Sequence, residues 1–251
     1  MDLGLRGTSV LVTGGTRGIG RATALAFARE GAHVTVSYAS DEAAAAAVVA
    51  ELEEAGAGAA CPMELADAGS IAAAVDAAVE RAGGLDVLVG NAVRWPFDAT
   101  EPLAESDPET WGRVLRVNLD GTAACLRAAL PHLAQSNAGR AVLISSGVAR
   151  TGLAGASAYT AAKAGLEGLV ATLVLEAGAH GVLVNLVSPG VTTTEGNLAN
   201  VPDDVRESFR EKTPTGRLST PEDVAKVVAF LGSPANGNVT GQYVSVSGGA
   251  P

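Results

Sequence analysis

The sequence predicts an α/β protein: a single doubly wound domain whose parallel sheet of about seven strands carries helices on both faces. Short β-branched runs alternate with longer, alanine-rich helical segments along the 251 residues. The strand candidates are apolar from end to end, which is typical of parallel strands buried on both faces. We find no internal repeat and no proline- or serine-rich linker. The sequence therefore predicts one domain over residues 1–251.

The elements follow one another in the order that such a fold requires. Strands are expected at 9–14, 33–38, 58–64, 86–90, 140–146, 182–188 and 242–248. Helices are expected at 18–30, 41–56, 69–82, 107–134, 158–178 and 221–232. The Ala43–Ala50 run belongs to the second helix, because alanine has the highest helix propensity.

Composition and charge exclude several classes of function. Hydrophobic residues make up 47% and charged residues 18%, which predicts a globular chain. The formal net charge of −10 predicts repulsion from nucleic acid and anionic membranes. The N-terminus has no basic region of a signal peptide, and no run approaches the roughly 20 apolar residues of a membrane span. Cys61 and Cys125 fit a reducing cytosol, and neither they nor the three histidines have metal-ligand spacing. We expect a cytoplasmic protein that binds no metal, nucleic acid or membrane.

The first strand candidate leads directly into the glycine-rich stretch TGGTRGIG. Gly14, Gly18 and Gly20 separate this strand from an amphipathic helix. Glycines at such a turn let backbone N–H groups approach a pyrophosphate at the helix N-terminus. The spacing differs from Gly-x-Gly-x-x-Gly, and glycines that serve the turn alone are the alternative. The loop predicts a dinucleotide-binding domain of the Rossmann type.

The end of the second strand bears on which dinucleotide binds. An NAD site needs an Asp or Glu about 20 residues after the glycines, to hold the ribose 2′-hydroxyl. Here the strand ends Tyr38-Ala39-Ser40, and no carboxylate follows until Asp41. Arg17 in the glycine loop is suited to a 2′-phosphate, although it would serve equally as a solvated charge. NADP(H) is therefore the favoured cofactor.

A tyrosine and a lysine lie four residues apart in AYTAAKAG. Tyr159 and Lys163 share one face of a helix. The basic residues are mostly arginines, so a lysine at this position suggests chemistry that requires an ammonium group. With the TGGTRGIG loop and Ser146, the chain resembles the short-chain dehydrogenase/reductase family from its first strand to its last glycines. The end of the chain is similar to bacterial 3-oxoacyl reductases.

The resemblance implies four catalytic residues: Asn118, Ser146, Tyr159 and Lys163. Tyr159 would donate the proton as hydride reaches a carbonyl carbon. Its ordinary pKa near 10 must fall by about 3 units, and the lysine ammonium and the oxidised nicotinamide both stabilise the phenolate. Ser146 would stabilise the developing alkoxide. Lys163 would also bind the cofactor ribose, and Asn118 would hold a water that links Lys163 to solvent.

The resemblance also implies the residues that contact the cofactor. SPGVTTTE resembles the family's Pro-Gly turn, which packs on the nicotinamide and leads to a threonine near the carboxamide. Gly90 and Val93 stand where the family usually has Asn and Gly, and a β-branched valine cannot adopt every backbone conformation of a glycine. Glu64 replaces the usual Asp or Asn beside adenine. The expected contacts are Gly14, Thr16, Arg17, Gly18, Ile19, Gly20, Tyr38, Ala39, Ser40, Glu64, Leu65, Asn91, Ala92, Val93, Tyr159, Lys163, Pro189, Gly190, Thr192 and Thr194.

The substrate side of the site is predicted from aromatic residues and from one polar segment. Trp95 and Phe97 suggest stacking on a flat substrate, although a surface loop also packs aromatic rings in this way. Trp111 is expected in the core. Residues 192–214 are expected to form a lid, and they contain no cluster of basic residues suited to a phosphopantetheine arm. The expected substrate contacts are Trp95, Ser146, Val148, Leu153 and Tyr159.

The leading interpretation is an NADPH-dependent ketoreductase for a cyclic or polycyclic aromatic ketone. The GNAVRWP stretch, Val93 and the alanine- and arginine-rich composition resemble tailoring reductases of angucycline-type polyketide (antibiotic) biosynthesis. A 3-oxoacyl-thioester reductase is the first alternative, and a non-catalytic dinucleotide-binding sensor is the second. The family resemblance further implies a homo-oligomer, a tetramer or a dimer, through helices 107–134 and 158–178.

Overall fold

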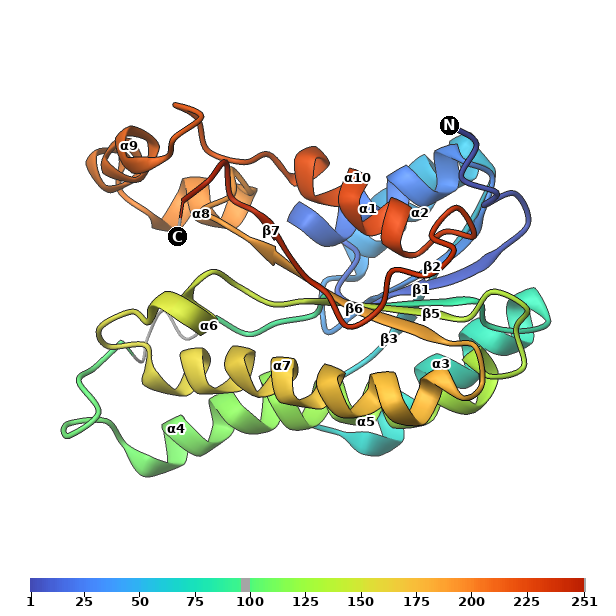
Figure 1. Ribbon diagram of the computed structural model, residues 1–251, viewed down its shortest axis with the longest axis horizontal. Helices are drawn as coiled ribbons and strands as arrows, with labels where there is room; N and C mark the ends of the chain where they lie inside the picture. The colour runs from blue at the N-terminus through green and yellow to red at the C-terminus, as the bar shows by residue number, and fades with distance from the viewer. Residues whose placement is uncertain (96–99, 251) are drawn as a thin grey trace.

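The computed structural model describes residues 1–95 and 100–250, and its centre is a seven-stranded parallel sheet (Figure 1). The strand order is β3-β2-β1-β4-β5-β6-β7. The strands are β1 (Ser9–Val12), β2 (His33–Tyr38), β3 (Ala57–Pro62), β4 (Val87–Gly90), β5 (Arg140–Ile144), β6 (Leu183–Pro189) and β7 (Tyr243–Val246). The predicted fold class is confirmed.

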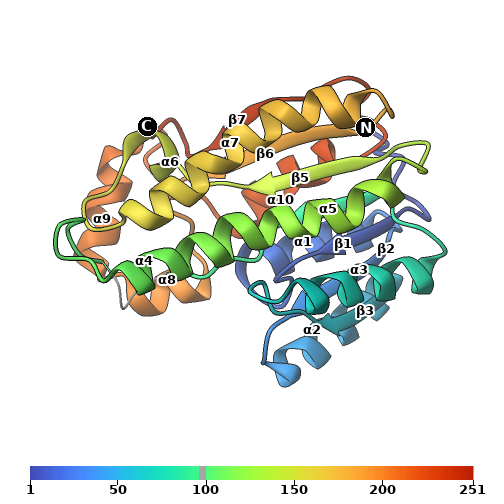
Figure 2. The same ribbon diagram turned by 90° about the horizontal axis from the view of Figure 1, so that it is seen from below.

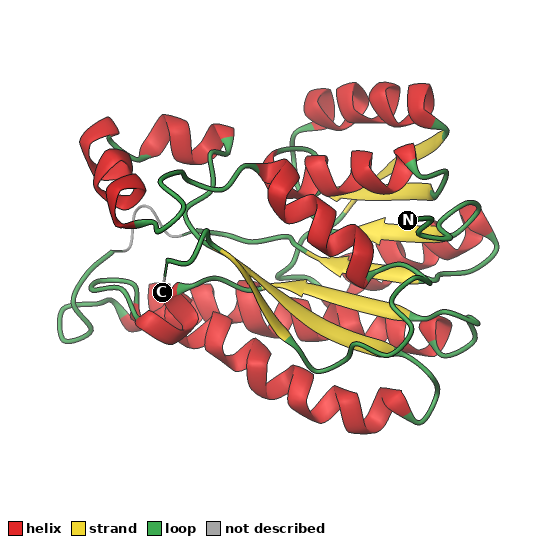
Figure 3. Cartoon of the chain, turned by 45° about the horizontal axis from the view of Figure 1, so that its top comes forward, coloured by secondary structure: helices red, strands yellow, loops and turns green. Residues whose placement is uncertain are grey.

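Helices cover both faces of the sheet (Figure 3). One layer contains α1 (Gly18–Arg29), α2 (Glu42–Ala55) and α10 (Pro221–Leu231). The other contains α3 (Ala68–Ala82), α5 (Gly121–Leu133) and α7 (Ser157–Gly178). Alternate strand residues pack into opposite layers: Val10 and Val12 join the core under α1 and α10, whereas Leu11 joins the core under α3 and α5. Both faces of each strand are therefore apolar.

The order of the strands reverses beside β1, whose two neighbours are β2 and β4. The connections after β1 and β4 leave the sheet in opposite directions, which opens a crevice at the carboxyl edge. The glycine loop and the segments after β4, β5 and β6 all begin at this edge. Every sequence motif with predicted chemistry is thereby brought to one side of the sheet.

The predicted helix 107–134 is interrupted by a π-helical turn. It consists of α4 (Pro108–Leu115), the π segment η1 (Arg116–Asp120) and α5, which run as one continuous rod beside α7 (Figure 2). Asn118 lies in the π segment. π turns inside longer helices are frequent at functional sites. The prediction was right about the extent of the helix and wrong about its regularity.

Three short helices were not predicted. They are α6 (Val148–Thr151), α8 (Glu195–Asn200) and α9 (Asp203–Lys212), and the last two make up much of the segment predicted as a lid. β1 and β5 each end two residues before the predicted position. Thr13, Gly14, Ser145 and Ser146 thus lie just beyond the strands, although Thr13 and Ser145 still donate their N–H groups to Val89 and Val187 on the neighbouring strands.

Helix α7 is 22 residues long with a mean hydropathy of 1.2, which by length and composition suffices to cross a membrane. No membrane-spanning run was predicted from the sequence, since polar residues interrupt this segment. Leu166, Val170 and Leu173 are buried in the core beneath the sheet. A core helix of a globular domain passes the same composition test, so α7 is weak evidence for a membrane span.

Candidate active site

The glycine loop after β1 is tightly folded against the loop after β4. Gly14 has a φ of 63°, and a Cβ on it would lie 2.9 Å from the Cα of Ala92. A Cβ on Gly20 would lie 2.2 Å from the carbonyl oxygen of Gly14. These close approaches require glycine, and the first N–H groups of α1 have no partner within the helix.

Thr13 joins these two loops, a role that was not predicted from the sequence. Its hydroxyl oxygen accepts hydrogen bonds from the backbone N–H groups of Asn91 and Ala92, both at 2.9 Å. The Asn91 side chain donates back to the carbonyl oxygens of Thr13 (2.9 Å) and Gly14 (3.0 Å). Asn91 and Ala92 thus lie beside the glycine loop, where cofactor contacts were predicted. A buried threonine at the end of an apolar strand was the signal for this role.

The carboxyl end of β2 presents no carboxylate to a ribose. Tyr38 is half-buried, and Ala39 and Ser40 are exposed. The next acidic residue, Asp41, caps α2 by accepting a hydrogen bond from the N–H of Ala44 at 2.9 Å. Arg17 is exposed at the N-cap position of α1. Thr16 and Ile19, also predicted contacts, are half-buried in the same loop.

The segment after β6 reaches across to the glycine loop. Gly18 donates its backbone N–H to the carboxylate of Glu195 at 3.1 Å. The Thr194 hydroxyl caps α8 by accepting from the N–H of Asn197 at 3.2 Å. Thr194 was predicted to lie near the nicotinamide carboxamide, and no contact with the cofactor was predicted for Glu195. In this structure Glu195 occupies a donor at the predicted pyrophosphate position.

Tyr159 and Lys163 are both buried on α7, with exposures of 7% and 2%. The Ser146 side chain, from the loop after β5, lies near enough to the Tyr159 phenol to lower its pKa. The Lys163 Nζ lies 5.8 Å from the centroid of the Tyr159 ring and donates to the Ile144 carbonyl at 2.8 Å. Three of the four predicted catalytic residues are therefore together at the carboxyl edge of the sheet.

Burial changes the protonation of both α7 residues. It raises the pKa of the Tyr159 phenol well above its ordinary value, and the Ser146 side chain acts in the opposite direction. Burial also lowers the pKa of the Lys163 ammonium to about 8. Lys163 therefore titrates closer to neutral pH than a free lysine, whereas ionisation of Tyr159 requires a large stabilisation of its phenolate by nearby positive charge.

Asn118 reaches the site through the backbone of Arg94. Its side-chain oxygen accepts from the Arg94 N–H at 3.0 Å, and its amide nitrogen donates to the carbonyl oxygens of Arg94 and Val114, each at 3.0 Å. These bonds fix the segment that precedes Trp95. The predicted role of Asn118 in holding a water stays a prediction.

The predicted nicotinamide turn packs against the loop that carries Ser146. The Pro189 carbonyl accepts from the N–H of Gly147 at 3.2 Å. A Cβ on Gly190 would lie 2.9 Å from the Cβ of Ser247, so only glycine fits. Thr192 is 2% exposed and donates its hydroxyl to the Gly190 carbonyl at 3.0 Å. This turn is rigid and abuts the catalytic serine loop.

The departures from the family pattern have local explanations. Val93 is 49% exposed and has a negative φ, as do all described residues other than glycine. A Cβ on Gly90 would lie 2.7 Å from Leu143 Cδ2, so the strand is packed for glycine at this point. Glu64 is exposed, and its carboxylate accepts from the N–H of Ala66 at 3.2 Å. Leu65 packs on the core.

An aromatic cluster surrounds Tyr159. The Trp95 ring lies edge-on to it, with ring centroids 4.3 Å apart and an interplanar angle of 67°. Val148 and Trp111 pack on the same cluster. Leu153 is 44% exposed and outside the cluster, and Phe97 lies outside the described residues.

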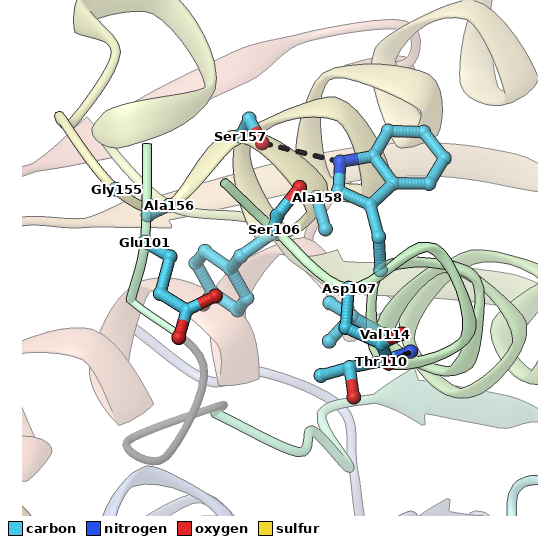
Figure 4. A pocket seen from close by; sticks show the side chains of 11 residues that line it. Glu101, Ser106, Asp107, Thr110, Val114, Gly155, Ala156, Ser157 and Ala158 are labelled. Atoms are coloured by element: carbon cyan, nitrogen blue, oxygen red, sulfur yellow. Dashed lines mark hydrogen bonds between the residues drawn. The ribbon is translucent and has the colours of Figure 1, made fainter. Parts of the chain in front are cut away.

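The prediction that Trp111 belongs to the core was wrong. It is half-buried and donates its indole N–H to the Ser157 hydroxyl at 3.1 Å. Trp111 and its neighbours line a pocket of about 90 Å³ between the start of α4 and the start of α7 (Figure 4). Its lining residues include Glu101, Ser106, Asp107 and Tyr159. The pocket is polar on one side, and Tyr159 contributes to its wall.

The arrangement fits a dinucleotide and an oxygen-bearing substrate. The glycine loop offers backbone donors at a helix N-terminus, and the two hydroxyl groups of Ser146 and Tyr159 meet nearby. Over residues 1–95 and 100–250, no group of three or more His, Cys, Asp or Glu side chains is placed to hold a metal ion.

Comparison with known proteins agrees with this geometry. The family model described as enoyl-(acyl carrier protein) reductase matches residues 14–251. The cis-4-hydroxycyclohexanecarboxylate dehydrogenase of Sinomonas cyclohexanicum is 38% identical over 95% of this chain and 94% of its own length. The 3-oxoacyl-[acyl-carrier-protein] reductase of Staphylococcus aureus is 36% identical over 96% of this chain and 97% of its own length.

Solved structures of dehydrogenases are also similar to this chain over nearly its full length. A short-chain dehydrogenase from Burkholderia cenocepacia in complex with NADP is 34% identical with a TM-score of 0.91, covering 98% of this chain and 99% of its own. A 7α-hydroxysteroid dehydrogenase complexed with NADH and 7-oxo glycochenodeoxycholic acid is 28% identical with a TM-score of 0.93, covering 99% and 96%. None of these four proteins supports the resemblance to angucycline-type tailoring reductases.

Proposed function

The chain belongs to the short-chain dehydrogenase/reductase family, and from this premise we propose that it is an NADPH-dependent ketoreductase acting on a cyclic ketone. As a member of this family it is an NAD(P)-dependent oxidoreductase that interconverts CH–OH and C=O groups. One observation carries the proposal: the Ser146 side chain lies near enough to the Tyr159 phenol to lower its pKa, beside the buried Lys163. Two converging hydroxyl groups are suited to hold a single carbonyl oxygen.

Each residue has a distinct task in this reaction. The bound nicotinamide dinucleotide supplies the hydride. Tyr159 donates a proton to the substrate oxygen, and Ser146 donates a hydrogen bond to the same oxygen as negative charge develops on it. Lys163 carries three N–H donors, one of which the Ile144 carbonyl accepts, and its charge stabilises the Tyr159 phenolate. Asn118 orients the backbone before Trp95.

We propose NADPH as the preferred cofactor. Arg17 is exposed at the start of α1, where a 2′-phosphate would be within reach of a guanidinium. Asp41 is engaged as the cap of α2 and is therefore unsuited to hold a 2′-hydroxyl. Structural relatives in complex with NADP and with NADH both exist, so the residues of this chain decide the preference.

A ring-shaped ketone is the substrate class that fits best. The Trp95 ring, Val148 and the edge of Trp111 give the surroundings of Tyr159 an aromatic and apolar wall. Two relatives act on, or bind, molecules with saturated rings: a hydroxycyclohexane carboxylate and a steroid. Polycyclic aromatic ketones belong to the same class by shape.

Reduction of a 3-oxoacyl thioester is the second candidate, and the 36% identity to a 3-oxoacyl-[acyl-carrier-protein] reductase favours it. A carrier protein with a phosphopantetheine arm requires free basic side chains. In the segment proposed as a lid, Arg206 is paired with Asp203 and Arg210 with Glu207. These pairs weaken the case for a phosphate partner.

The test is NADPH oxidation with a bicyclic ketone, a polycyclic quinone-type ketone and an acetoacetyl thioester. We expect turnover of the ring ketones, loss of at least about 1,000-fold in Tyr159→Phe, and unchanged NADPH binding in that variant. A preference for the thioester would favour the second candidate. Cofactor binding without turnover of any carbonyl would favour the sensor interpretation.

We also propose a homo-oligomer, a dimer or a tetramer, formed through the outward faces of α5 and α7. The solvent face of α7 carries Ala161, Gly168, Ala171 and Leu175, and Leu175 is 79% exposed. A Leu175→Glu variant is expected to dissociate to monomers by light scattering, and a monomeric parent protein would contradict the proposal. The cytoplasmic localisation stays a prediction.

A further inference from the structure

Tyr243 on β7 lies outside every motif of the proposed reaction, yet its hydroxyl touches two segments of the site. It donates to the backbone carbonyl of Ser146 at 3.3 Å. It is also 2.5 Å from the hydroxyl oxygen of Ser188. Because the phenol proton is directed to Ser146, Ser188 is the donor in the second bond. The resulting chain runs from Ser188 through Tyr243 to Ser146.

Tyr243 joins the loop that carries Ser146 to the Pro189-Gly190 turn, and hydride transfer requires a fixed distance between these two segments. Ser146 is the proposed oxyanion donor, and its side chain lies near enough to the Tyr159 phenol to lower its pKa. Ser188 is 1% exposed and directly precedes the Pro189-Gly190 turn. Two backbone bonds also join these segments: Ser145 N–H to the Val187 carbonyl at 2.8 Å, and Gly147 N–H to the Pro189 carbonyl at 3.2 Å. A shift of either segment would change the distance between the serine hydroxyl and the nicotinamide turn.

The ring of Tyr243 is itself held in place. The Arg150 guanidinium carbon lies 3.5 Å from the ring centroid, a cation–π contact. Arg150 is bonded to both carboxylate oxygens of Glu167, at 3.0 to 3.3 Å. Glu167 lies on α7, one helical turn beyond Lys163. Arg150 thus connects the Tyr243 ring to the helix that carries Tyr159 and Lys163.

We propose that Tyr243 is a positioning residue that sets the orientation of Ser146 for carbonyl reduction, with Arg150 and Glu167 holding its ring. The proposal rests on the proposed function, since it assigns Ser146 as the oxyanion donor. Tyr243 does not touch the substrate. It acts through the Ser146 backbone, because a carbonyl held from behind fixes the φ and ψ angles that aim the serine side chain.

The test is a double-mutant cycle between Tyr243→Phe and Ser146→Ala. Phenylalanine keeps the ring and its contact with Arg150 and removes only the hydroxyl. We expect Tyr243→Phe to lower kcat about 10- to 100-fold in the parent, with less than about a threefold change in the NADPH Kd. In the Ser146→Ala background the same substitution is expected to leave kcat unchanged, because the group it positions is gone.

A matched control is Ser245→Ala, which removes another hydroxyl hydrogen bond from β7, the bond to Ser247 at 2.9 Å. It is expected to leave kcat within about twofold of the parent. Equal losses from Tyr243→Phe in both backgrounds would overturn the proposal, because a general structural role is additive. An unchanged kcat in Tyr243→Phe would overturn it as well. Failure of the proposed function would show separately, as full turnover in Tyr159→Phe.

Discussion

Glu195 in α8 accepts a hydrogen bond from the backbone N–H of Gly18, the residue that begins α1. We propose that the dinucleotide pyrophosphate binds at this same N–H group. Both groups are anionic, so on this proposal the cofactor displaces Glu195, and the segment proposed as a lid competes with it for one donor.

Removal of this charge is expected to tighten cofactor binding. Glu195→Gln should lower the NADPH Kd by about three- to tenfold, because a charge-assisted hydrogen bond of about 1 kcal/mol no longer opposes binding. Fluorescence titration of NADPH measures the change. Glu222→Gln, at another exposed helix start, is the matched control and should leave Kd unaltered. Weaker binding in Glu195→Gln would mean that Glu195 supports the cofactor site instead of competing for it.

The buried lysine predicts a specific dependence of stability on pH. Burial lowers the folded-state pKa of Lys163 to about 8 from its ordinary 10.5. Between these values the unfolded chain binds a proton that the folded chain lacks, so stability rises with pH across this window and is lost as pH falls toward 8. Below about pH 8 both states are protonated and the dependence ends.

We expect the cofactor-free protein to gain about 2 kcal/mol of unfolding free energy from Lys163 between pH 8 and pH 10. Burial raises the pKa of Cys61, Cys125 and Tyr159, so these groups lower stability as pH rises above their unfolded-state values, and they do so equally in the parent and the variant. Urea titrations of the parent and of Lys163→Met at both pH values isolate this gain, which the variant should lack. Lys226→Met, an exposed lysine on α10, should retain it. An equal pH dependence in Lys163→Met and the parent would contradict a depressed pKa.

The glycine loop predicts a steric requirement at Gly20. Alanine there would place its Cβ 2.2 Å from the Gly14 carbonyl and 2.5 Å from the Asn91 amide. We expect Gly20→Ala to cost about 1–3 kcal/mol of stability and to weaken NADPH binding at least tenfold, because backbone must move. Gly84→Ala is the control: it has a negative φ, no atom within 4 Å, and an expected effect near zero. Parent-like binding in Gly20→Ala would show that the loop adapts.

The elements that sequence reasoning found are those with local signals. Strand and helix alternation predicted a parallel sheet with helices on both faces, and the motif residues Ser146, Tyr159 and Lys163 meet at one edge of it. The groups that it missed act through contacts between distant segments. Gly18 and Glu195 are 177 residues apart, and Tyr243 and Ser146 are 97 apart. Neither pair has a periodicity or spacing that a sequence pattern reports.

The π segment at Asn118 illustrates a second reason for failure. Residues Arg116–Asp120 have ordinary helical composition, and nothing local distinguishes a π turn from an α turn there. The contacts of Asn118 with the Arg94 backbone accompany this geometry, and they come from a different loop. Helix extent is thus readable from a single sequence, whereas a shift of the hydrogen-bond register depends on tertiary contacts.

Cofactor preference can be tested at Arg17. If its guanidinium meets the 2′-phosphate of NADPH, Arg17→Ala should raise the KM for NADPH about tenfold and leave the KM for NADH within about twofold. Arg21→Ala on the same helix is the control, because the Arg21 guanidinium is paired with Glu51 and is not proposed to contact the 2′-phosphate. Equal losses with both cofactors would assign Arg17 to the pyrophosphate or to loop structure.

The contact between Trp95 and Tyr159 predicts the determinant of ring-ketone specificity. The Trp95 ring lies 4.3 Å from that of Tyr159, so a flat substrate that reaches the tyrosine hydroxyl must pack against the indole or displace it. Trp95→Ala should raise the KM for a bicyclic ketone about tenfold, equivalent to about 1.4 kcal/mol of aromatic contact, and leave the KM for an acetoacetyl thioester nearly unchanged.

Fluorescence separates this role from simple packing. The chain has two tryptophans, so Trp111→Phe leaves Trp95 as the single indole emitter. That variant is expected to keep parent-like KM values, since phenylalanine retains an aromatic ring in the wall beside Tyr159. Addition of the ring ketone to its NADP⁺ complex should quench the remaining emission in a saturable manner, with a midpoint near the KM. An unquenched signal, together with an unaltered KM in Trp95→Ala, would show that Trp95 only covers Tyr159 and does not select the substrate.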